Sequence, residues 1–342
     1  MKISIIIPAY NEEETIKSCI LACLKQTRKP DHIIVVNDWS TDNTWKIIDS
    51  FWKQIKWIHL KKNTWNKSHA QEKAISYVTD DVFIATDADT ILDKDFVKEI
   101  EKSFKQSKKI VSVCGYVISM KWNWITWCRE LEYMIWQDVH KRAQSYINSI
   151  LVLPWCASWF KTKFFKKHII FEHDTIAEDL DFSYKINNYE KSRYIIFNNK
   201  AIVYTQDPNT IWAYTHQLKR WQWWGWQNLK KHFPKVNKLF FIFEISMSYI
   251  EWLIFSLIII LLPIINIKLY INWLILFFTF TTLLGIYGAI KRKRIDLFFY
   301  SFCLIFLSYI NSYVFLTEFY KQIIKNNKSL VWFKPKRRNI NL

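Results

Sequence analysis

The chain has 342 residues and a formal net charge of +18, and 51% of its residues are hydrophobic. A basic excess indicates contact either with nucleic acid or with anionic lipid and phosphate-bearing substrates. The long apolar runs of the C-terminal third favour the second, and no nucleic-acid-binding motif is found in the sequence, so we do not expect a nucleic-acid partner.

The N-terminal part of the chain alternates between strand and helix patterns. Helical spacing follows the first predicted strand, and residues 68–79 form a second predicted helix. The predicted strands cover residues 2–10, 32–38, 57–63 and 82–90. This alternation predicts an α/β domain with a mostly parallel sheet and helices on both faces. Ligands bind such sheets at the carboxyl ends of strands, where Asp38, Asp87 and Asp89 lie.

Glycine and tryptophan are present in unusual numbers. The chain has 4 Gly and 19 Trp, whereas average usage predicts roughly 24 Gly in this length. Trp39, Trp65, Trp155 and Trp159 occur where turns usually have glycine, because a positive φ is costly for a bulky side chain. We hypothesise that most of these Trp are glycines encoded by UGA. The alternative is a truly Trp-rich protein, and a peptide mass across residues 31–46 distinguishes the two.

The C-terminal part is predicted to cross a membrane. Each of three apolar segments is about 20 residues long, enough to span a bilayer as a helix. The segments cover roughly residues 245–266, 270–290 and 296–317. Between the last two, "KRKR" is typical of a cytoplasmic loop. Three spans would place the N-terminal domain and the basic tail on opposite sides of the membrane. The loop at 291–294 and the tail are both basic, however, and therefore favour the same side. We therefore expect either a re-entrant element or one segment that lies flat.

These patterns divide the chain into three parts. Residues 1–235 are predicted to form a cytoplasmic catalytic domain, with an interfacial helix at about 210–232. Residues 236–320 form the transmembrane region of about three helices, and residues 321–342 form a basic tail.

Two acidic motifs are candidates for chemistry. Asp87 and Asp89 follow an apolar strand, and two carboxylates in this position can hold a hard divalent cation that neutralises a diphosphate. The alternative is a solvated turn. Further along, "AEDLD" brings together Glu178, Asp179 and Asp181, one of which could be a general base. The alternative is the acidic first turn of a helix, which the helix dipole favours.

A third motif, "QLKRW", lies in an aromatic and basic helix. Arg220 could bind a phosphate, and the aromatic ring at position 221 could stack on a sugar. The alternative is an amphipathic helix at the membrane surface, and the two interpretations are compatible.

Taken in order, Asp38, the D-x-D at 87–89, Glu178-Asp179 and the Q-x-x-R-W at 217–221, followed by apolar spans, form a specific set. The chain resembles the family-2 glycosyltransferases of the membrane-embedded kind, which includes poly-N-acetylglucosamine, chitin, hyaluronan and cellulose synthases. The resemblance covers about residues 3–235 and implies a GT-A, Rossmann-like catalytic domain. The tail "WFKPKR" also resembles a stretch that follows the last span in relatives.

The chain departs from the family in a few positions. Glycine stands in the family where this chain has Trp39, in agreement with the glycine that the composition and the turn context predict there, and Trp221 matches a genuine family tryptophan. Ala177 replaces a usual Thr, but the carboxylates beside it are intact.

The resemblance implies roles on the donor side of the site. Asp38 would bind the uracil of a UDP-sugar, and Lys67 would approach the nucleotide. Asp87 and Asp89 would hold the nucleotide and Mg²⁺ or Mn²⁺, with Asp89 the more direct metal ligand.

The resemblance also implies roles on the acceptor side. Asp179 would be the general base and Glu178 would support it. Gln217, Arg220 and Trp221 would line the diphosphate and acceptor sites. The reaction would be a one-step inverting displacement with UDP as the leaving group.

The expected protein is therefore a multi-pass enzyme of the cell membrane that builds a polysaccharide from UDP-GlcNAc or UDP-glucose, in contact with membrane lipid. A partner subunit or second copy would complete a channel. One alternative is transfer of a single sugar to a lipid-linked acceptor. Another is a non-catalytic membrane scaffold, in which Asp179→Asn would leave function unchanged.

Overall fold

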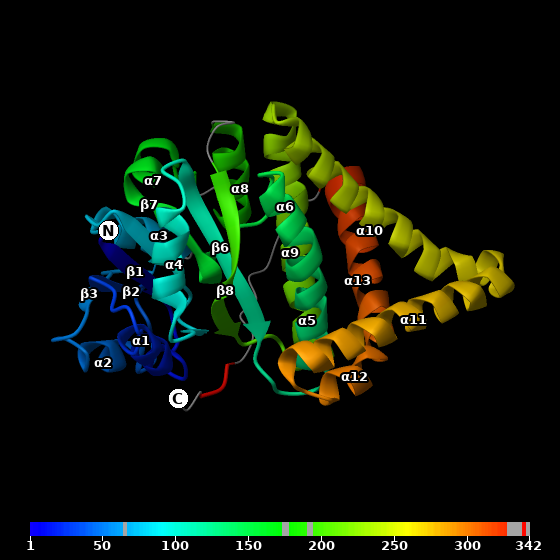
Figure 1. Ribbon diagram of the computed structural model, residues 1–342, viewed down its shortest axis with the longest axis horizontal. Helices are drawn as coiled ribbons and strands as arrows, with labels where there is room; N and C mark the ends of the chain where they lie inside the picture. The colour runs from blue at the N-terminus through cyan, green and yellow to red at the C-terminus, as the bar shows by residue number, and fades with distance from the viewer. Residues whose placement is uncertain (64–66, 173–177, 190–193, 327–336, 340–342) are drawn as a thin grey trace.

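The computed structural model describes residues 1–63, 67–172, 178–189, 194–326 and 337–339. The described residues form one eight-stranded sheet with the order β3-β2-β1-β4-β7-β6-β8-β5 (Figure 1). The strands are β1 (Ile3–Ala9), β2 (His32–Asn37), β3 (Lys56–His59), β4 (Val82–Ala85), β5 (Thr90–Leu92), β6 (Ile110–Ser119), β7 (Ser158–Lys161) and β8 (Tyr194–Thr205).

The two halves of the sheet differ in strand direction. Strands β1 to β4 pair in parallel, as the alternating pattern predicts. Strand β7 is antiparallel to both β4 and β6, β5 is antiparallel to β8, and β6 and β8 are parallel. The predicted α/β class is confirmed, with a sheet that is mixed beyond β4.

Helices cover both faces of the sheet. Side chains of α1 (Ile16–Leu24), α2 (Thr44–Asp49) and α4 (Phe96–Lys105) pack on one face. Those of α3 (Lys67–Ser76), α7 (Thr162–His168) and α8 (Glu178–Tyr189) pack on the other.

Strand β1 shows why the strand sequences are continuous apolar runs. Ile5 and Ile7 belong to the core on one face and Ile6 to the core on the other. A strand buried on both faces has no polar side to alternate with. Each such side chain contributes about 1.5–3 kcal/mol through burial.

A helical layer stands beside the sheet. The helix α5 (Trp124–Ile135) begins at a capping box in which Asn123 and Thr126 exchange hydrogen bonds, and it continues through a π-helical turn (Trp136–Lys141) into α6 (Arg142–Tyr146). The helix α9 (Ile211–His232) begins at the side-chain cap of Thr210, and it matches the predicted helix at 210–232. Short 3-10 turns cover Trp155–Ala157 and Phe233–Lys235.

Two C-terminal helices are long and apolar enough to cross a membrane, judged by length and composition among the described residues. They are α10 (Leu239–Ile265) and α11 (Ile267–Arg292), which extend away from the sheet and meet at Asn266 (Figure 1).

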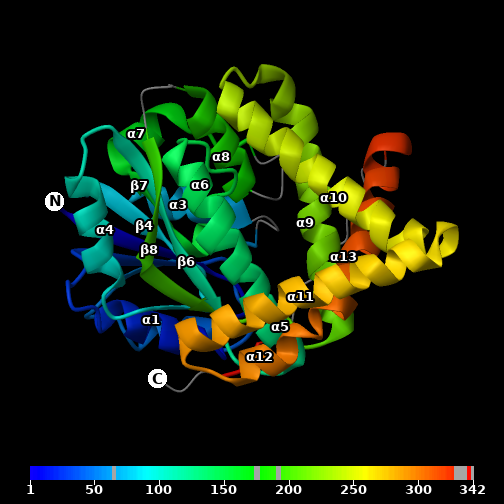
Figure 2. The same ribbon diagram turned by 45° about the vertical axis from the view of Figure 1, so that its right-hand side comes forward.

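The third predicted span differs from the prediction. It is divided into α12 (Asp296–Ser301) and the 16-residue α13 (Leu304–Phe319), which ends in a π-helical turn (Tyr320–Ile324). Figure 2 shows α13 beside α9, and the Tyr214 hydroxyl donates to Asn311 Oδ1 at 2.6 Å. Polar contacts of this kind fit a helix that packs on the catalytic domain.

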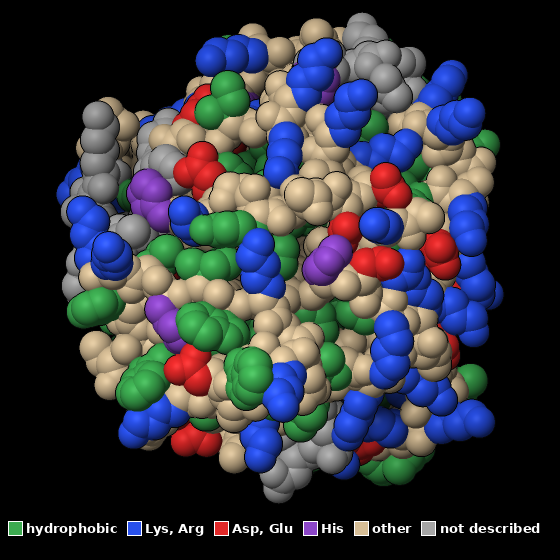
Figure 3. Space-filling view, turned by 90° about the vertical axis from the view of Figure 1, so that its left-hand side faces the viewer, with side chains coloured by type: hydrophobic (Ala, Val, Ile, Leu, Met, Phe, Trp, Pro, Cys, Tyr) green, Lys and Arg blue, Asp and Glu red, His purple; other side chains and the backbone are tan. Residues whose placement is uncertain are grey.

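The basic segment after α11 also contacts the catalytic domain. Glu130 of α5 lies 2.6 Å from Arg294 and 3.2 Å from Arg292, and Lys291 pairs with Asp138. The end of α11 is therefore held against the domain from which α10 departs. On the face shown in Figure 3, Lys and Arg side chains are spread over the surface with acidic side chains among them.

Trp39 has the backbone conformation that the turn was predicted to require. Its φ is 58° and its side chain is 53% exposed. Trp155 and Trp159 are instead buried, and within the described part of the chain their indole N–H groups find no hydrogen-bond partner. Trp65 lies outside the described residues. The prediction of a glycine-type turn at position 39 is confirmed, while the UGA hypothesis stays a prediction.

Trp39→Gly is expected to stabilise the protein. A left-handed conformation costs a bulky residue about 1–2 kcal/mol, and glycine loses about 0.5–1 kcal/mol more chain entropy on folding, so the net gain is about 0.5–1 kcal/mol. Thermal unfolding measures it. Trp45→Gly is the matched control, because Trp45 lies inside α2, where glycine costs about 1 kcal/mol. A lower melting temperature for Trp39→Gly would contradict the expectation.

Candidate active site

Charged side chains from three distant segments meet at the end of β4. Lys67, the first residue of α3, contacts Asp87 and lies 3.7 Å from Glu178 of α8. The Gln71 side chain, one turn further along α3, donates to Glu178 Oε1. Asp179 follows Glu178 and accepts a hydrogen bond from the Leu180 N–H at 2.8 Å. The sheet thus brings the D-x-D motif and the acidic helix together, as the sequence predicts.

The carboxyl group of Asp179 is poised to exchange a proton near neutral pH. Burial raises its pKa, and the adjacent Glu178 and nearby Asp87 act in the same direction, whereas Lys67 opposes them. The result is a pKa of about 7. A general base whose pKa is near the working pH is ionised in a large fraction of the molecules and still takes up a proton readily.

The same environment acts on Asp87 and Lys67. Burial, and then Asp89, raise the pKa of Asp87 against the opposing charge of Lys67. Burial alone would lower the pKa of Lys67, but Asp87 and Glu178 outweigh it and raise the value. Lys67 therefore remains a cation that holds the acidic cluster together.

Asp38 lies at the end of β2 and is 5% exposed. Its N–H donates to the Ala9 carbonyl at 2.8 Å. A hydrogen-bonded chain that sequence reasoning missed supports this turn: Asn37 accepts from the Ser40 hydroxyl, and its side chain lies 2.9 Å from His59 Nδ1, whose Nε2 lies 2.9 Å from Asp49.

The residues of the Q-x-x-R-W motif on α9 have different neighbours. Burial and the neighbouring Arg337 lower the pKa of Arg220, while Asp179, Glu178 and Asp87 act in the opposite direction. Arg220 therefore faces the acidic cluster.

The other two residues of the motif lie around it. Trp221 is 37% exposed, with the Arg129 guanidinium 5.1 Å from its ring. Gln217 is buried, and its side-chain carbonyl oxygen finds no hydrogen-bond partner among the residues that the structure describes.

Asp181, the third acid of "AEDLD", has a different surrounding. Its carboxylate accepts from His232 Nε2 at 2.6 Å and from Lys185 at 2.6 Å. Because His232 ends α9, this contact joins the helix of Asp179 to the helix of Arg220. Asp181 therefore joins α8 to α9, whereas Glu178 belongs to the cluster around Lys67.

Arg129 lies at the centre of a buried polar group that sequence reasoning missed. It pairs with Glu132, and its Nε lies 3.9 Å from Asp207. Tyr133 donates to Asp207 at 2.8 Å, and Asn311 of α13 donates to Glu132 at 3.0 Å. No motif marks these residues, because they are spread over the chain.

Arg337 in the tail reaches the D-x-D motif. Its guanidinium pairs with Asp89, which is 7% exposed. Of the tail motif "WFKPKR", only Arg337 belongs to the described residues.

Asp87 and Asp89 can supply part of the ligand set of Mg²⁺ or Mn²⁺, and water or substrate phosphates would supply the rest. Within the described residues, no group of three or more Asp, Glu, His or Cys could hold a metal ion. Asp87 and Asp89 offer hard oxygen ligands, and Mg²⁺ is commonly bound by one or two carboxylates together with substrate phosphates. The residues present therefore fit a metal that arrives with a diphosphate.

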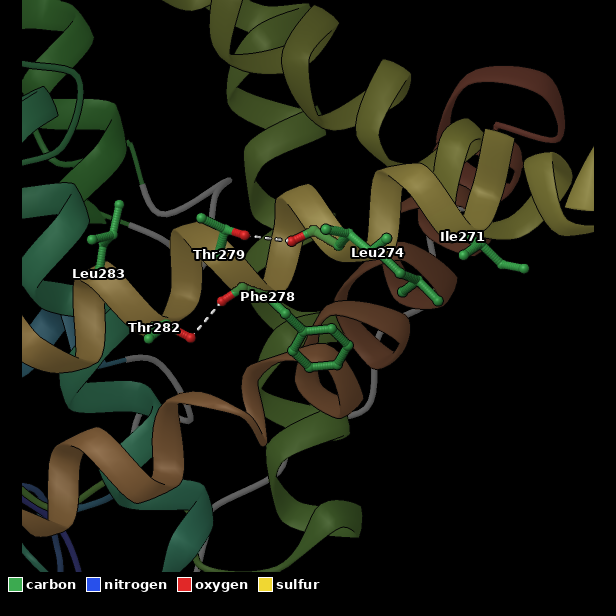
Figure 4. Close-up of a pocket in the computed structure, with 7 residues that line it drawn as sticks. Ile271, Leu274, Phe278, Thr279, Thr282 and Leu283 are labelled. Atoms are coloured by element: carbon green, nitrogen blue, oxygen red, sulfur yellow. Dashed lines mark hydrogen bonds between the residues drawn. The ribbon is translucent and has the colours of Figure 1, made fainter. Parts of the chain in front are cut away.

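A pocket on α11 is unrelated to this chemistry. Figure 4 shows Ile271, Leu274 and Phe278 along one side of the helix. The hydroxyls of Thr279 and Thr282 donate to carbonyls of their own helix at 2.8 and 2.7 Å. The lining is apolar and belongs to a candidate membrane span.

Comparisons with known proteins agree with this geometry. Residues 4–169 match the family model of glycosyl transferase family 2. The chain is 28% identical over 234 residues to the poly-beta-1,6-N-acetyl-D-glucosamine synthase of Staphylococcus epidermidis, covering 68% of this chain and 56% of that protein. The enzyme of the same name from Staphylococcus aureus is 26% identical over 239 residues, covering 69% and 57%. The chain thus spans less than two thirds of the length of these relatives.

Two solved structures share the fold. The mannosyltransferase PcManGT from Pyrobaculum calidifontis, in complex with GDP-Man and Mn²⁺, aligns with a TM-score of 0.63 at 14% identity, covering 95% of this chain and 88% of that one. TarS 1–349 of S. aureus, in complex with UDP, aligns with a TM-score of 0.52 at 15% identity, covering 94% and 92%. The predicted GT-A class is confirmed. We conclude that this chain contains a glycosyl transferase family 2 domain, which begins in β1 and ends just after α7.

Proposed function

We propose that the protein is an inverting, metal-dependent glycosyltransferase that moves a sugar from UDP-GlcNAc or UDP-glucose to a growing polysaccharide at the membrane. The observation that carries the proposal is the meeting of Asp179, whose pKa is about 7, with Lys67 and the D-x-D motif at the end of β4. The relatives named as poly-beta-1,6-N-acetyl-D-glucosamine synthases support the donor and the product class.

In this proposal the donor lies along the carboxyl ends of β1, β2 and β4. Asp38 binds the uracil, and Lys67 holds the Asp87 carboxylate in place beside the nucleotide. Asp87 and Asp89 hold Mg²⁺ or Mn²⁺, which supplies positive charge to the diphosphate when bound. Arg220 adds a second cation from α9, so the charge of the leaving UDP is neutralised.

The acceptor hydroxyl lies near Asp179. Asp179 takes its proton while the acceptor oxygen attacks the anomeric carbon, and the bond to the UDP oxygen breaks in the same step. Gln71 holds Glu178 beside Asp179, and Trp221 offers an exposed ring face on which a sugar can stack. Positioning supplies most of the rate, because acceptor and donor are held in line.

The membrane arrangement follows from α10 and α11. A two-helix hairpin through the cell membrane returns the chain to the side from which it left, which places the catalytic domain, the basic segment at 291–294 and the tail together in the cytoplasm. The contacts of Glu130 with Arg292 and Arg294 support this arrangement. Two spans are few for a polymer channel, so a partner subunit or a second copy would complete one.

A second candidate function is transfer of a single sugar to a lipid-linked acceptor. The small number of candidate spans among the described residues favours it, because a single transfer needs no channel. A non-catalytic scaffold is the remaining alternative.

The test uses membranes that carry the full chain, in its printed and glycine-restored forms. We would supply a panel of UDP-sugars with Mg²⁺ or Mn²⁺ and record UDP release and product length. Release from one donor with long products supports the polymer synthase. Short or lipid-linked products support the second candidate. No release from any donor, with the protein folded, would contradict both.

The pH dependence of kcat/KM is expected to have an acid limb near pH 7. Asp179 must be ionised to act, and its pKa in the free enzyme is about 7, so activity falls with unit slope below that pH. Lys67→Met should move the limb to higher pH, because the charge of Lys67 lowers the pKa of Asp179. Glu178→Gln should move it to lower pH. A limb that stays in place in both variants would exclude Asp179 as the titrating group.

A further inference from the structure

The described tail residues are held in a specific place beside the sheet. The Gln206 side chain, at the end of β8 and 3% exposed, donates to the Arg338 carbonyl at 2.8 Å and accepts from the Arg338 N–H at 3.0 Å. Arg338 also donates to the Lys121 carbonyl at 2.6 Å, and its guanidinium lies 4.6 Å from the Trp122 ring. A buried amide that pairs with both backbone groups of one residue fixes the register of this segment.

This docking directs Arg337 at the D-x-D motif. The Arg337 guanidinium donates to the Gln206 carbonyl at 2.6 Å and pairs through its other terminal nitrogen with Asp89 Oδ2. The second carboxylate oxygen of Asp89 accepts from the Thr90 hydroxyl at 3.4 Å. Each oxygen of Asp89 thus has one partner, and a metal ion that binds Asp89 Oδ2 competes with Arg337 for that oxygen.

We propose that Arg337 is an intramolecular competitor of the divalent metal: the tail holds Asp89 when the metal is absent and releases it when metal and diphosphate arrive. The inference rests on the proposed function, in which Asp89 is a metal ligand. A guanidinium and a divalent cation repel each other, so the binding of either one at Asp89 weakens the binding of the other.

The place of the freed guanidinium follows from its neighbours. Arg337 lies close enough to Arg220 to lower the pKa of Arg220, so the two cations are neighbours beside the acidic cluster. A bound diphosphate would be the anion between them, and planar guanidinium groups suit phosphate oxygens. Arg337 therefore exchanges one anionic partner for another, and the tail contacts through Gln206 need not break.

Mn²⁺ binding to the detergent-solubilised full chain, followed by the loss of the free-ion EPR signal without nucleotide, tests the competition. Arg337→Gln should bind Mn²⁺ about tenfold more tightly than the wild type, the size of effect that one charge-assisted hydrogen bond produces. Gln206→Ala, which detaches the tail by another route, should change Mn²⁺ affinity in the same direction.

Arg338→Gln is the matched control. It removes the same charge from the same segment but leaves the backbone contacts with Gln206, so Mn²⁺ affinity should stay at the wild-type value. Equal or weaker Mn²⁺ binding by Arg337→Gln, or an equal gain in Arg338→Gln, would overturn the inference.

UDP binding by equilibrium dialysis separates this inference from the proposed function. A wild-type chain that binds UDP but shows no change in Mn²⁺ affinity on Arg337→Gln retains the proposed function and loses only the competition. A chain that binds neither UDP nor Mn²⁺ in any form contradicts both.

Discussion

Asp179→Asn is expected to lower the rate of sugar transfer by about 10²–10⁴-fold, the usual contribution of a positioned general base. Asparagine keeps the shape of the side chain and can still accept the hydrogen bond from the Leu180 N–H, but it cannot take the acceptor proton. UDP binding should be unchanged, because the substitution leaves Asp38, Lys67 and the D-x-D motif intact. Initial rates of UDP release at saturating donor measure the effect.

The same variant should be more stable than the wild type at pH 8. The pKa of Asp179 is raised from 3.8 to about 7 in the folded protein, so the folded state binds the proton more tightly than the unfolded state. Folding stability contributed by this group is complete below about pH 4 and is lost as the pH rises to about 7. Removing the charge restores it, and a higher melting temperature of the variant confirms that lost activity is not lost folding.

Asp181→Asn is the matched control on the same helix. Its carboxylate faces His232 and Lys185 instead of the cluster, so the transfer rate per folded molecule should change little while the melting temperature falls. An active Asp179→Asn beside an inactive Glu178→Gln would assign the base to Glu178 instead.

Arg129→Met is expected to destabilise the fold by about 3–5 kcal/mol, the cost of removing one partner from a buried ion pair. Arg129 is 5% exposed, and its removal leaves the buried Asp207 and the partly buried Glu132 without their cation. These residues join α5 to α13 through Asn311, so the substitution should also weaken the packing of the helical layer. Thermal unfolding followed by tryptophan fluorescence measures it.

Two further variants test this explanation. Adding Glu132→Gln to Arg129→Met should recover part of the stability, because it removes the charge left without a partner. Lys98→Met breaks an exposed pair with Asp95, 3.6 Å long, and should cost about 0–1 kcal/mol. A loss for Arg129→Met no larger than that for Lys98→Met would show that the buried group contributes little.

Local patterns in the sequence were sufficient for the strands β1 to β4 and for α9, whereas only the family resemblance implied that the D-x-D motif and the acidic helix share one site. Apolar runs that end in Asp38 and Asp87 predict parallel strands, and parallel strands place their carboxyl ends at one edge. The turn at Trp39 was also predictable, because a short segment sets its own φ.

The sequence could not indicate which helices cross a membrane and which pack on the domain. Residues 296–317 are apolar enough for either environment, and in the structure α13 contacts both the candidate span α10 and the helix α9, with Asn311 bonded to Tyr214 and Glu132. Likewise, "KRKR" has the same composition whether it faces lipid headgroups or the buried Glu130.

What the sequence by itself determined is therefore the class of fold and the edge of the sheet at which Asp38 and the D-x-D motif lie, because these depend on neighbours along the chain. The tertiary structure decided that Glu178 lies beside Lys67, that Asp181 instead joins α8 to α9, and that Arg337 holds Asp89. The partner of Arg337 lies more than 200 residues away in the chain, and no local pattern records a contact that exists only after folding.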